Sequence, residues 1–128
     1  MNIGLIPQKW ARLTPKKVAV IDEQRNRRIT FRELEDLINK IANGFISIGL
    51  QKGDRVGILS KNSIEHLALF YACGRIGLIA QPMNWRLSSS EVIKIIENGN
   101  PNIVIVDSDL SELSKQVQVE TDLVDKWF

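Results

Sequence analysis

Residues 54–87 constrain the fold of this chain more than any other stretch. Two apolar runs, Val56–Leu59 and Leu78–Ala80, flank the segment Asn62–Arg75, which is apolar on nearly every side. Continuous apolar strands on either side of a helix are typical of a parallel strand-helix-strand unit, because both faces of such a sheet are covered. The asparagine that opens the segment can cap the helix, and a glutamate three residues later can reach back to it. We therefore predict a central helix capped at this asparagine, followed by a strand that stops at Pro82.

Two capping boxes mark the start of two further helices. Thr30 is followed three residues later by Glu33, and Ser88 is followed in the same way by Glu91. In this pattern each side chain accepts a hydrogen bond from the backbone N–H of the other residue, which fixes the helix start. Apolar residues then recur every three or four positions, so we predict two helices, each stopped by a glycine.

The N-terminal region predicts a short helix and a ribbon. Ile3–Leu13 is amphipathic, and such a segment can contact a membrane. A short apolar face more often packs on the protein's own body, and we expect that arrangement here. Val18–Ile21 and Arg28–Thr30 are separated by a polar turn, and they predict an antiparallel ribbon at the edge of the sheet.

The C-terminal region continues the alternation of strands and helices. Ile103–Val106 is typical of a buried strand, and Leu110–Lys115 of one more helix. After that helix, Val117 and Val119 alternate like the start of a strand. The last eight residues, TDLVDKWF, carry apolar side chains with nothing left to cover them.

This order of elements predicts an α/β fold, a mostly parallel sheet with helices on both faces, plus an antiparallel β-ribbon near the N-terminus. A chain of 128 residues that is 44% hydrophobic and 25% charged fits one globular region over residues 1–128. A net charge of +2 gives no indication of nucleic acid as a partner. One cysteine, no secretory signal and no apolar stretch of roughly 20 residues predict a soluble, cytoplasmic chain with no membrane span.

Ligands approach the carboxyl ends of strands in such a sheet. Here those ends are Ser60–Asn62, Pro82–Arg86 and Asp107–Asp109. Neither a G-x-G-x-x-G motif nor a glycine-rich phosphate loop ending in Gly-Lys-Ser/Thr is present. The single histidine, His66, and the single cysteine, Cys73, lie in the central helix without the neighbours that catalysis needs. Asp107 and Asp109 could hold a cation, but their position is also that of capping residues, and we assign no metal site.

Three motifs in register indicate a family. Residues 29–34 read I-T-F-R-E-L, residues 77–87 combine a glycine-alanine-proline stretch with N-x-R-L, and NIVIVD follows. At this spacing they resemble the N-terminal part of adenylate-forming acyl-CoA synthetases and ligases, from about Val18 to about Asp109. The serine-rich cap after N-x-R-L is similar to the acyl- and aryl-CoA ligase branch, and less similar to the amino-acid-activating domains of peptide synthetases.

The resemblance implies a ligase that activates a carboxylic acid, such as a long- or medium-chain fatty acid or an aryl acid, with ATP and Mg²⁺, and transfers it to coenzyme A. The family's phosphate loop, ribose-binding aspartate and catalytic lysine lie downstream of the matching region. We therefore name no catalytic residue, and we expect a truncated N-terminal subdomain that is inactive alone and whose partner is the remainder of the ligase. Apolar surface left exposed could also join copies into a homo-oligomer.

The resemblance further implies one ligand contact within this chain. In related synthetases the nucleotide end of coenzyme A lies just after the strand that matches Leu78–Pro82. In this sequence Trp85 could stack on adenine and Arg86 could pair with a phosphate, beside a helix N-terminus. Packing on a neighbouring helix and a surface ion pair are the alternative roles. Two further functions stay open, namely one half of a split ligase and a free-standing flavodoxin-like binding domain.

Overall fold

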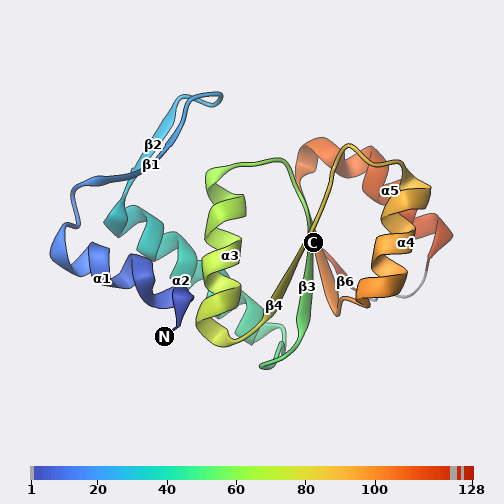
Figure 1. Cartoon of the computed structure of the whole chain (residues 1–128), viewed down its shortest axis with the longest axis horizontal. Coiled ribbons are helices and arrows are strands. Elements are labelled where there is room, and N and C mark those ends of the chain that lie inside the picture. The colour runs from blue at the N-terminus through green and yellow to red at the C-terminus, as the bar shows by residue number, and fades with distance from the viewer. Residues whose placement is uncertain (1, 122–123, 125) are drawn as a thin grey trace. The chain divides into compact units, whose positions relative to one another are not determined.

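Two units organise the chain, which a computed structural model describes for residues 2–121, 124 and 126–128 (Figure 1). The first unit comprises residues 2–52 and 62–78, and the second comprises residues 53–61 and those described from 79 onward. The segment 54–87 is divided between them, because its helix belongs to the first unit and its strands belong to the second. The predicted order, a ribbon followed by alternating helices and strands, is confirmed.

Three helices form the body of the first unit, preceded by the 3-10 turn η1 (Ile3–Leu5): they are α1 (Ile6–Leu13), α2 (Phe31–Ser47) and α3 (Ile64–Ile76). The predicted capping box opens α2. Thr30 Oγ1 accepts a hydrogen bond from Glu33 N at 3.2 Å, and Glu33 Oε1 accepts one from Thr30 N at 3.0 Å. Gly49, with a φ of 92°, follows the end of the helix and allows the left-handed turn that stops it.

The cap of α3 differs from the prediction. Ser63, not Asn62, is the capping residue, and its Oγ accepts a hydrogen bond from His66 N at 3.0 Å. Serine and asparagine are about equally good caps, so the sequence alone did not separate the two neighbouring positions. The helix is nearly apolar throughout, as predicted, and it ends at Gly77, whose φ is 77°.

Helix α1 packs against the rest of the first unit through small side chains. Pro7 and Ala11 are buried, whereas Ile6, Trp10 and Leu13 are 38%, 42% and 56% exposed. The expectation that the apolar face of this segment packs on the protein's own body is therefore met only in part: the Trp10 ring lies 6.2 Å from that of Phe31, whereas Leu13 is mostly exposed. None of the described helices is long and apolar enough to cross a membrane.

The ribbon of β1 (Val18–Asp22) and β2 (Arg27–Thr30) is antiparallel, as predicted. Each strand is one residue longer than the sequence indicated. The two strands form a sheet of their own rather than the edge of the larger sheet. The turn between them uses Asn26 at a φ of 50°, a conformation that asparagine tolerates better than most residues.

The second unit contains a parallel sheet in the order β4-β3-β5-β6. Its strands are β3 (Arg55–Leu59), β4 (Ile79–Met83), β5 (Ile103–Val106) and β6 (Lys126–Trp127). Pro82 was expected to stop β4 but lies inside it. The sheet tolerates proline there because β4 is at the edge, where one row of N–H groups has no partner strand.

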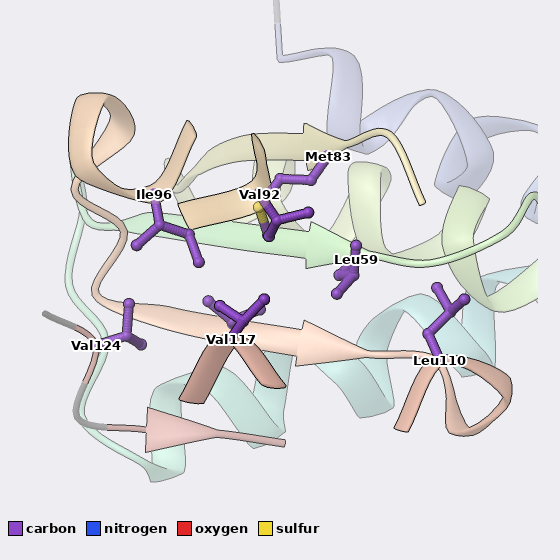
Figure 2. Packing of buried hydrophobic residues seen from close by; sticks show 8 residues of the cluster. Leu59, Met83, Val92, Ile96, Leu110, Val117 and Val124 are labelled. Atoms are coloured by element: carbon purple, nitrogen blue, oxygen red, sulfur yellow. The ribbon is translucent and has the colours of Figure 1, made fainter. Parts of the chain in front are cut away.

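Helices α4 (Ser89–Gly99) and α5 (Ser111–Glu120) complete the second unit, with the 3-10 turn η2 (Ser108–Leu110) before α5. The predicted box at Ser88 opens α4. Side chains from both helices converge on the sheet in one buried cluster (Figure 2). The members of this cluster are Leu59, Met83, Val92, Ile96, Val104, Leu110, Val117 and Val124. The α/β class, with a parallel sheet flanked by helices and a small antiparallel sheet, is confirmed.

Two predictions for the C-terminal region are wrong. Val117 and Val119 belong to helix α5 and do not begin a strand. The end of the chain is also not left uncovered: Val124 is buried in the cluster, and Trp127 packs against it and pairs in β6 with Val104 of β5. Leu123, another apolar residue of TDLVDKWF, lies outside the described residues.

Candidate functional site

Three loops leave the parallel sheet at the same edge. The register pairs Leu59, the last residue of β3, with Met83 of β4 and with Val106 of β5. Residues 60–61, 84–87 and 107–109 therefore follow neighbouring strand ends, where ligands of such sheets bind. A hydrogen bond from Asp107 N to the carbonyl oxygen of Leu59, 2.9 Å long, ties two of the loops together.

Trp85 is the centre of this edge, and two cations lie over its ring. Lys61 Nζ is 5.0 Å from the ring centroid, and Arg86 Cζ is 4.8 Å from it. Both distances are typical of cation–π contacts. The indole is partly buried against the apolar cluster of the second unit, so packing holds the ring in place. Among the described residues Arg86 has no carboxylate partner, which argues against the surface ion pair considered above.

The backbone around Trp85 is held by its neighbours. Asn84 Oδ1 accepts a hydrogen bond from Arg86 N at 3.0 Å, and Asn84 O accepts one from Leu87 N at 3.2 Å. This small turn presents Trp85 and Arg86 immediately before α4. The N-terminus of α4 is already partly neutralised, because Glu91 Oε1 accepts hydrogen bonds from Ser88 Oγ at 2.9 Å and Ser88 N at 3.3 Å. The cations, more than the helix end, are therefore the groups available to an anion.

The aspartates on the third loop have a structural role. Asp107 Oδ1 accepts a hydrogen bond from Asp109 N at 3.0 Å, which caps η2. Within the described part of the chain, no group of three or more His, Cys, Asp and Glu residues could hold a metal ion. The cap explains Asp107 without a ligand.

His66 and Cys73 both lie on α3. The His66 ring is 5.1 Å from that of Phe70, and burial lowers the pKa of the imidazole. Its Nδ1 is buried without a hydrogen-bond partner in the described structure. Burial also raises the pKa of the Cys73 thiol to about 11, so little thiolate exists at neutral pH. A cysteine nucleophile reacts as the thiolate, which Cys73 scarcely forms. A histidine base takes a proton from a group within hydrogen-bond distance, and no such partner of His66 Nδ1 is present in the described structure.

Sequence reasoning missed the most extensive polar network. Arg75 on α3 donates to both carboxylate oxygens of Glu35 on α2, at 2.7 and 2.8 Å, and to Asn39 Oδ1 at 2.7 Å. It also donates twice to the carbonyl oxygen of Gly4, at 3.0 and 2.7 Å. All of these groups belong to the first unit, and they hold its N-terminal turn and two helices together.

Lys61 was also missed as a neighbour of Trp85. Its position in the sequence could have indicated the contact. Lys61 comes just after β3, Trp85 comes just after β4, and these two strands are neighbours in the sheet. The same unit also has a hollow of about 340 Å³ beside Gly57, Met83 and Ile95. The lining of this hollow is mostly apolar. The side-chain amide of Gln81, which lines it from β4, donates a hydrogen bond to the carbonyl oxygen of Gly99 at 3.0 Å.

A family model described as AMP-binding enzyme matches residues 7–127. The chain belongs to this family. The match extends beyond the motif-bearing region, which runs from about Val18 to about Asp109. The predicted resemblance to acyl- and aryl-CoA ligases is therefore confirmed.

Similar proteins place this chain within longer ligases. The long-chain-fatty-acid–CoA ligase FadD13 of Mycobacterium tuberculosis is 30% identical over 121 residues, which are 94% of this chain and 24% of that protein. A feruloyl-CoA synthase of Amycolatopsis sp is 30% identical over 104 residues, which are 81% of this chain and 21% of that protein. The chain thus spans about a quarter of the length of these members of the AMP-binding family.

Solved structures agree. The N-terminal domain of FACL13 from Mycobacterium tuberculosis superposes with a TM-score of 0.93 at 29% identity, covering 100% of this chain and 33% of that chain. Coronafacic acid ligase from Pectobacterium brasiliense gives a TM-score of 0.90 at 33% identity, covering 99% of this chain and 25% of that chain. The fold of an AMP-binding N-terminal region is therefore shared over the whole described chain.

Proposed function

We propose that this chain is the N-terminal subdomain of an ATP-dependent acid–thiol ligase. The complete enzyme converts a carboxylic acid, ATP and coenzyme A into acyl-CoA, AMP and diphosphate through an acyl-adenylate. Relatives named for long-chain fatty acids, feruloyl-CoA and 2-succinylbenzoate support a carboxylic acid, aliphatic or aryl, as the substrate. ATP and Mg²⁺ are handled by the remainder of the ligase, which is the partner of this chain in the cytoplasm.

Within this division of labour, the loop 84–87 contacts the nucleotide end of coenzyme A. The observation that carries the proposal is the Trp85 ring with Lys61 Nζ and Arg86 Cζ within 5.0 Å of its centroid. An indole stacks on adenine, and the two flexible cations that lie over the ring leave its face to pair with the phosphates of the same nucleotide. Trp85 is braced by the apolar cluster, so little ordering is needed when the nucleotide binds.

The test is Arg86→Ala in a complete ligase that carries this segment, with adenylation and thioester formation measured separately. A charge-assisted hydrogen bond contributes about 1.5–3 kcal/mol, so the KM for coenzyme A should rise at least several-fold while adenylation stays unchanged. Lys94→Ala, an exposed cation on α4, is the matched control and should change neither step. A loss of both steps together, or no change, would show that Arg86 is structural.

A second measurement tests the assignment of chemistry to the remainder of the enzyme. The purified 128-residue chain should show no acid-dependent exchange of pyrophosphate into ATP, because the phosphate loop and catalytic lysine that the family uses on the developing phosphate charge lie downstream of the matching region. Exchange above background would contradict the proposal that adenylation requires the downstream residues.

A further inference from the structure

Five large apolar side chains are exposed along the first thirteen residues. Ile3, Leu5, Ile6, Trp10 and Leu13 have exposed fractions of 67%, 42%, 38%, 42% and 56%. We call these five residues the N-terminal stripe. No other described segment of similar length gathers as many exposed large apolar residues. Contiguous exposed apolar surface of this kind marks an interaction site more often than chance.

The way α1 is anchored determines which face is exposed. A Cβ at Gly4 would lie 2.2 Å from Arg75 N and 2.6 Å from Tyr71 O, so this glycine allows the backbone of η1 to touch α3. Pro7 and Ala11 then face the protein body. Ile6, Trp10 and Leu13 follow the helical spacing of four and three residues, and they lie on a neighbouring face that the body covers only in part. The Trp10 ring lies 6.2 Å from that of Phe31 on one side. Their exposure is thus built into the packing of the unit.

The charged residues around the stripe are all cations. Lys9, Arg12, Lys16 and Lys17 are exposed, and the first acidic residue of the chain is Asp22. None of these four cations has a carboxylate within 4.0 Å among the residues that the structure describes. Lys9 Nζ instead lies 5.4 Å from the centroid of the Trp10 ring.

Acidic groups on the helix that packs against α1 are already engaged. On α2, Glu33 completes the capping box, Glu35 pairs with Arg75, and Asp36 lies 3.4 Å from Arg32. The basic charge beside the stripe is therefore left for an external anion.

We propose that the N-terminal stripe and its four flanking cations bind the surface of a lipid bilayer that contains anionic lipids. An amphipathic helix with a basic polar face binds in the plane of such an interface, with its apolar side chains at the boundary of the acyl chains. Trp10 suits this depth, since an indole has an apolar body and one N–H group. The cations lie at the level of the headgroups, where their attraction to anionic lipid is strongest. This inference does not depend on the proposed ligase function.

The test is co-sedimentation of the chain with vesicles of phosphatidylcholine alone and with vesicles that also contain phosphatidylglycerol. The chain should bind the anionic vesicles much more strongly, and binding should weaken as salt is raised. Lys16→Gln with Lys17→Gln should lower the partition coefficient at least tenfold, given roughly fivefold for each basic residue near an anionic surface. Trp10→Ser with Leu13→Ser should lower it by a similar factor and should leave the circular dichroism spectrum unchanged.

Two matched controls come from the other unit. Val119→Ser replaces an apolar residue that is 86% exposed, and Lys94→Gln with Lys115→Gln removes two exposed cations. Both controls should bind vesicles as the parent chain does. The proposal is wrong if the parent chain does not sediment with anionic vesicles, or if the controls lose binding equally. It is also wrong if Trp10→Ser with Leu13→Ser converts a dimer to a monomer without changing vesicle binding, since a second copy of the chain would then cover the stripe.

Discussion

Both units of this chain bury apolar side chains, but the first also contains a nearly buried ion pair. In the first unit, one guanidinium joins three segments: Arg75 bonds the carboxylate of Glu35 on α2 and the carbonyl oxygen of Gly4 before α1. The two side chains of this ion pair are only 10% and 9% exposed. In the second unit, a buried cluster of eight apolar side chains joins the sheet to helices α4 and α5 (Figure 2).

The difference matters because polar and apolar contacts specify structure differently. A guanidinium fork bonds in fixed directions, so it holds the N-terminal turn in one position and thereby exposes the N-terminal stripe. An apolar cluster has no such directions, and it braces Trp85 by packing alone. The N-terminal stripe is therefore held by directed polar contacts and Trp85 by apolar packing, so a substitution can disturb one proposed binding surface without the other. Trp10 reports on the first unit by fluorescence, while Trp85 and Trp127 report on the second.

The largest loss of stability is expected for Arg75→Met. It leaves the Glu35 carboxylate nearly buried without its cation, and breaking a buried pair in this way costs about 3–5 kcal/mol. Urea unfolding followed by circular dichroism measures the change. The double variant Arg75→Met with Glu35→Leu should recover most of the loss, because an apolar pair of similar volume removes both buried charges together. If Arg75→Met alone costs under about 1 kcal/mol, the network is not what holds the first unit.

The matching change in the second unit is Leu59→Ala. Leu59 is 0% exposed and lies in the apolar cluster, so its truncation should cost about 2–5 kcal/mol through lost burial and the cavity left behind. The loss should be visible in the fluorescence of Trp85 and Trp127. Val119→Ala, at a residue 86% exposed on α5, is the control and should change the free energy of unfolding by less than about 0.5 kcal/mol.

Replacing two glycines of the first unit by alanine should change the free energy of unfolding in opposite directions. Gly4→Ala places a Cβ against the backbone of Arg75 and Tyr71, and overpacking of this kind costs roughly 1–3 kcal/mol. Gly44→Ala, inside α2, meets nothing within 4 Å and should stabilise by about 0.5–1 kcal/mol through helix propensity. Thermal unfolding of both variants checks the pair. Equal effects would mean that the close approach of η1 to α3 does not stabilise the unit.

Local signals predicted most of the fold. Both capping boxes, at Thr30 and Ser88, form as expected, and so do the strands that the apolar runs indicated, although β4 is only partly buried. The alternation of Val117 and Val119 was misleading for a geometric reason. Residues two apart lie on the same face of a strand but on opposite sides of a helix. The spacing of the two valines therefore indicated a strand, whereas Val117 is buried and Val119 is 86% exposed, as helix α5 requires. The helix extended through them, beyond the Lys115 that the sequence suggested.

The interactions that the sequence did not predict are all long-range. Glu35 and Arg75 are 40 residues apart, and each has the spacing of a surface position on its own helix. Only the packing of α2 against α3 brings them together. The position of the candidate site could be predicted, because strand ends gather at one edge of a parallel sheet. The second cation over Trp85 could not, because the side chain of Lys61 can reach several neighbours from the end of β3.

The smallest effect is expected for an ion pair of nearly the same length in the same unit. Arg27 Nη1 lies 2.6 Å from Glu65 Oε1, but these side chains are 43% and 50% exposed. Water and salt screen such a pair, and ordering two long side chains opposes the attraction, so Arg27→Met should destabilise far less than Arg75→Met. Partial burial acts to raise the pKa of Glu65, but the hydrogen bond from Arg27, a backbone hydrogen bond and the charges of Arg27 and Arg25 together outweigh it, and the pKa is lowered.

A carboxyl group whose pKa is lower in the folded state stabilises the fold above its unfolded pKa, and this contribution is lost as the pH falls through the folded value. The parent chain and Arg27→Met should therefore differ slightly in urea midpoint at neutral pH and low salt, and the difference should vanish in acid or at high salt. Arg75→Met should stay destabilised at high salt, because its pair is shielded from solvent. If salt reduced both differences equally, burial would not be what distinguishes the two ion pairs.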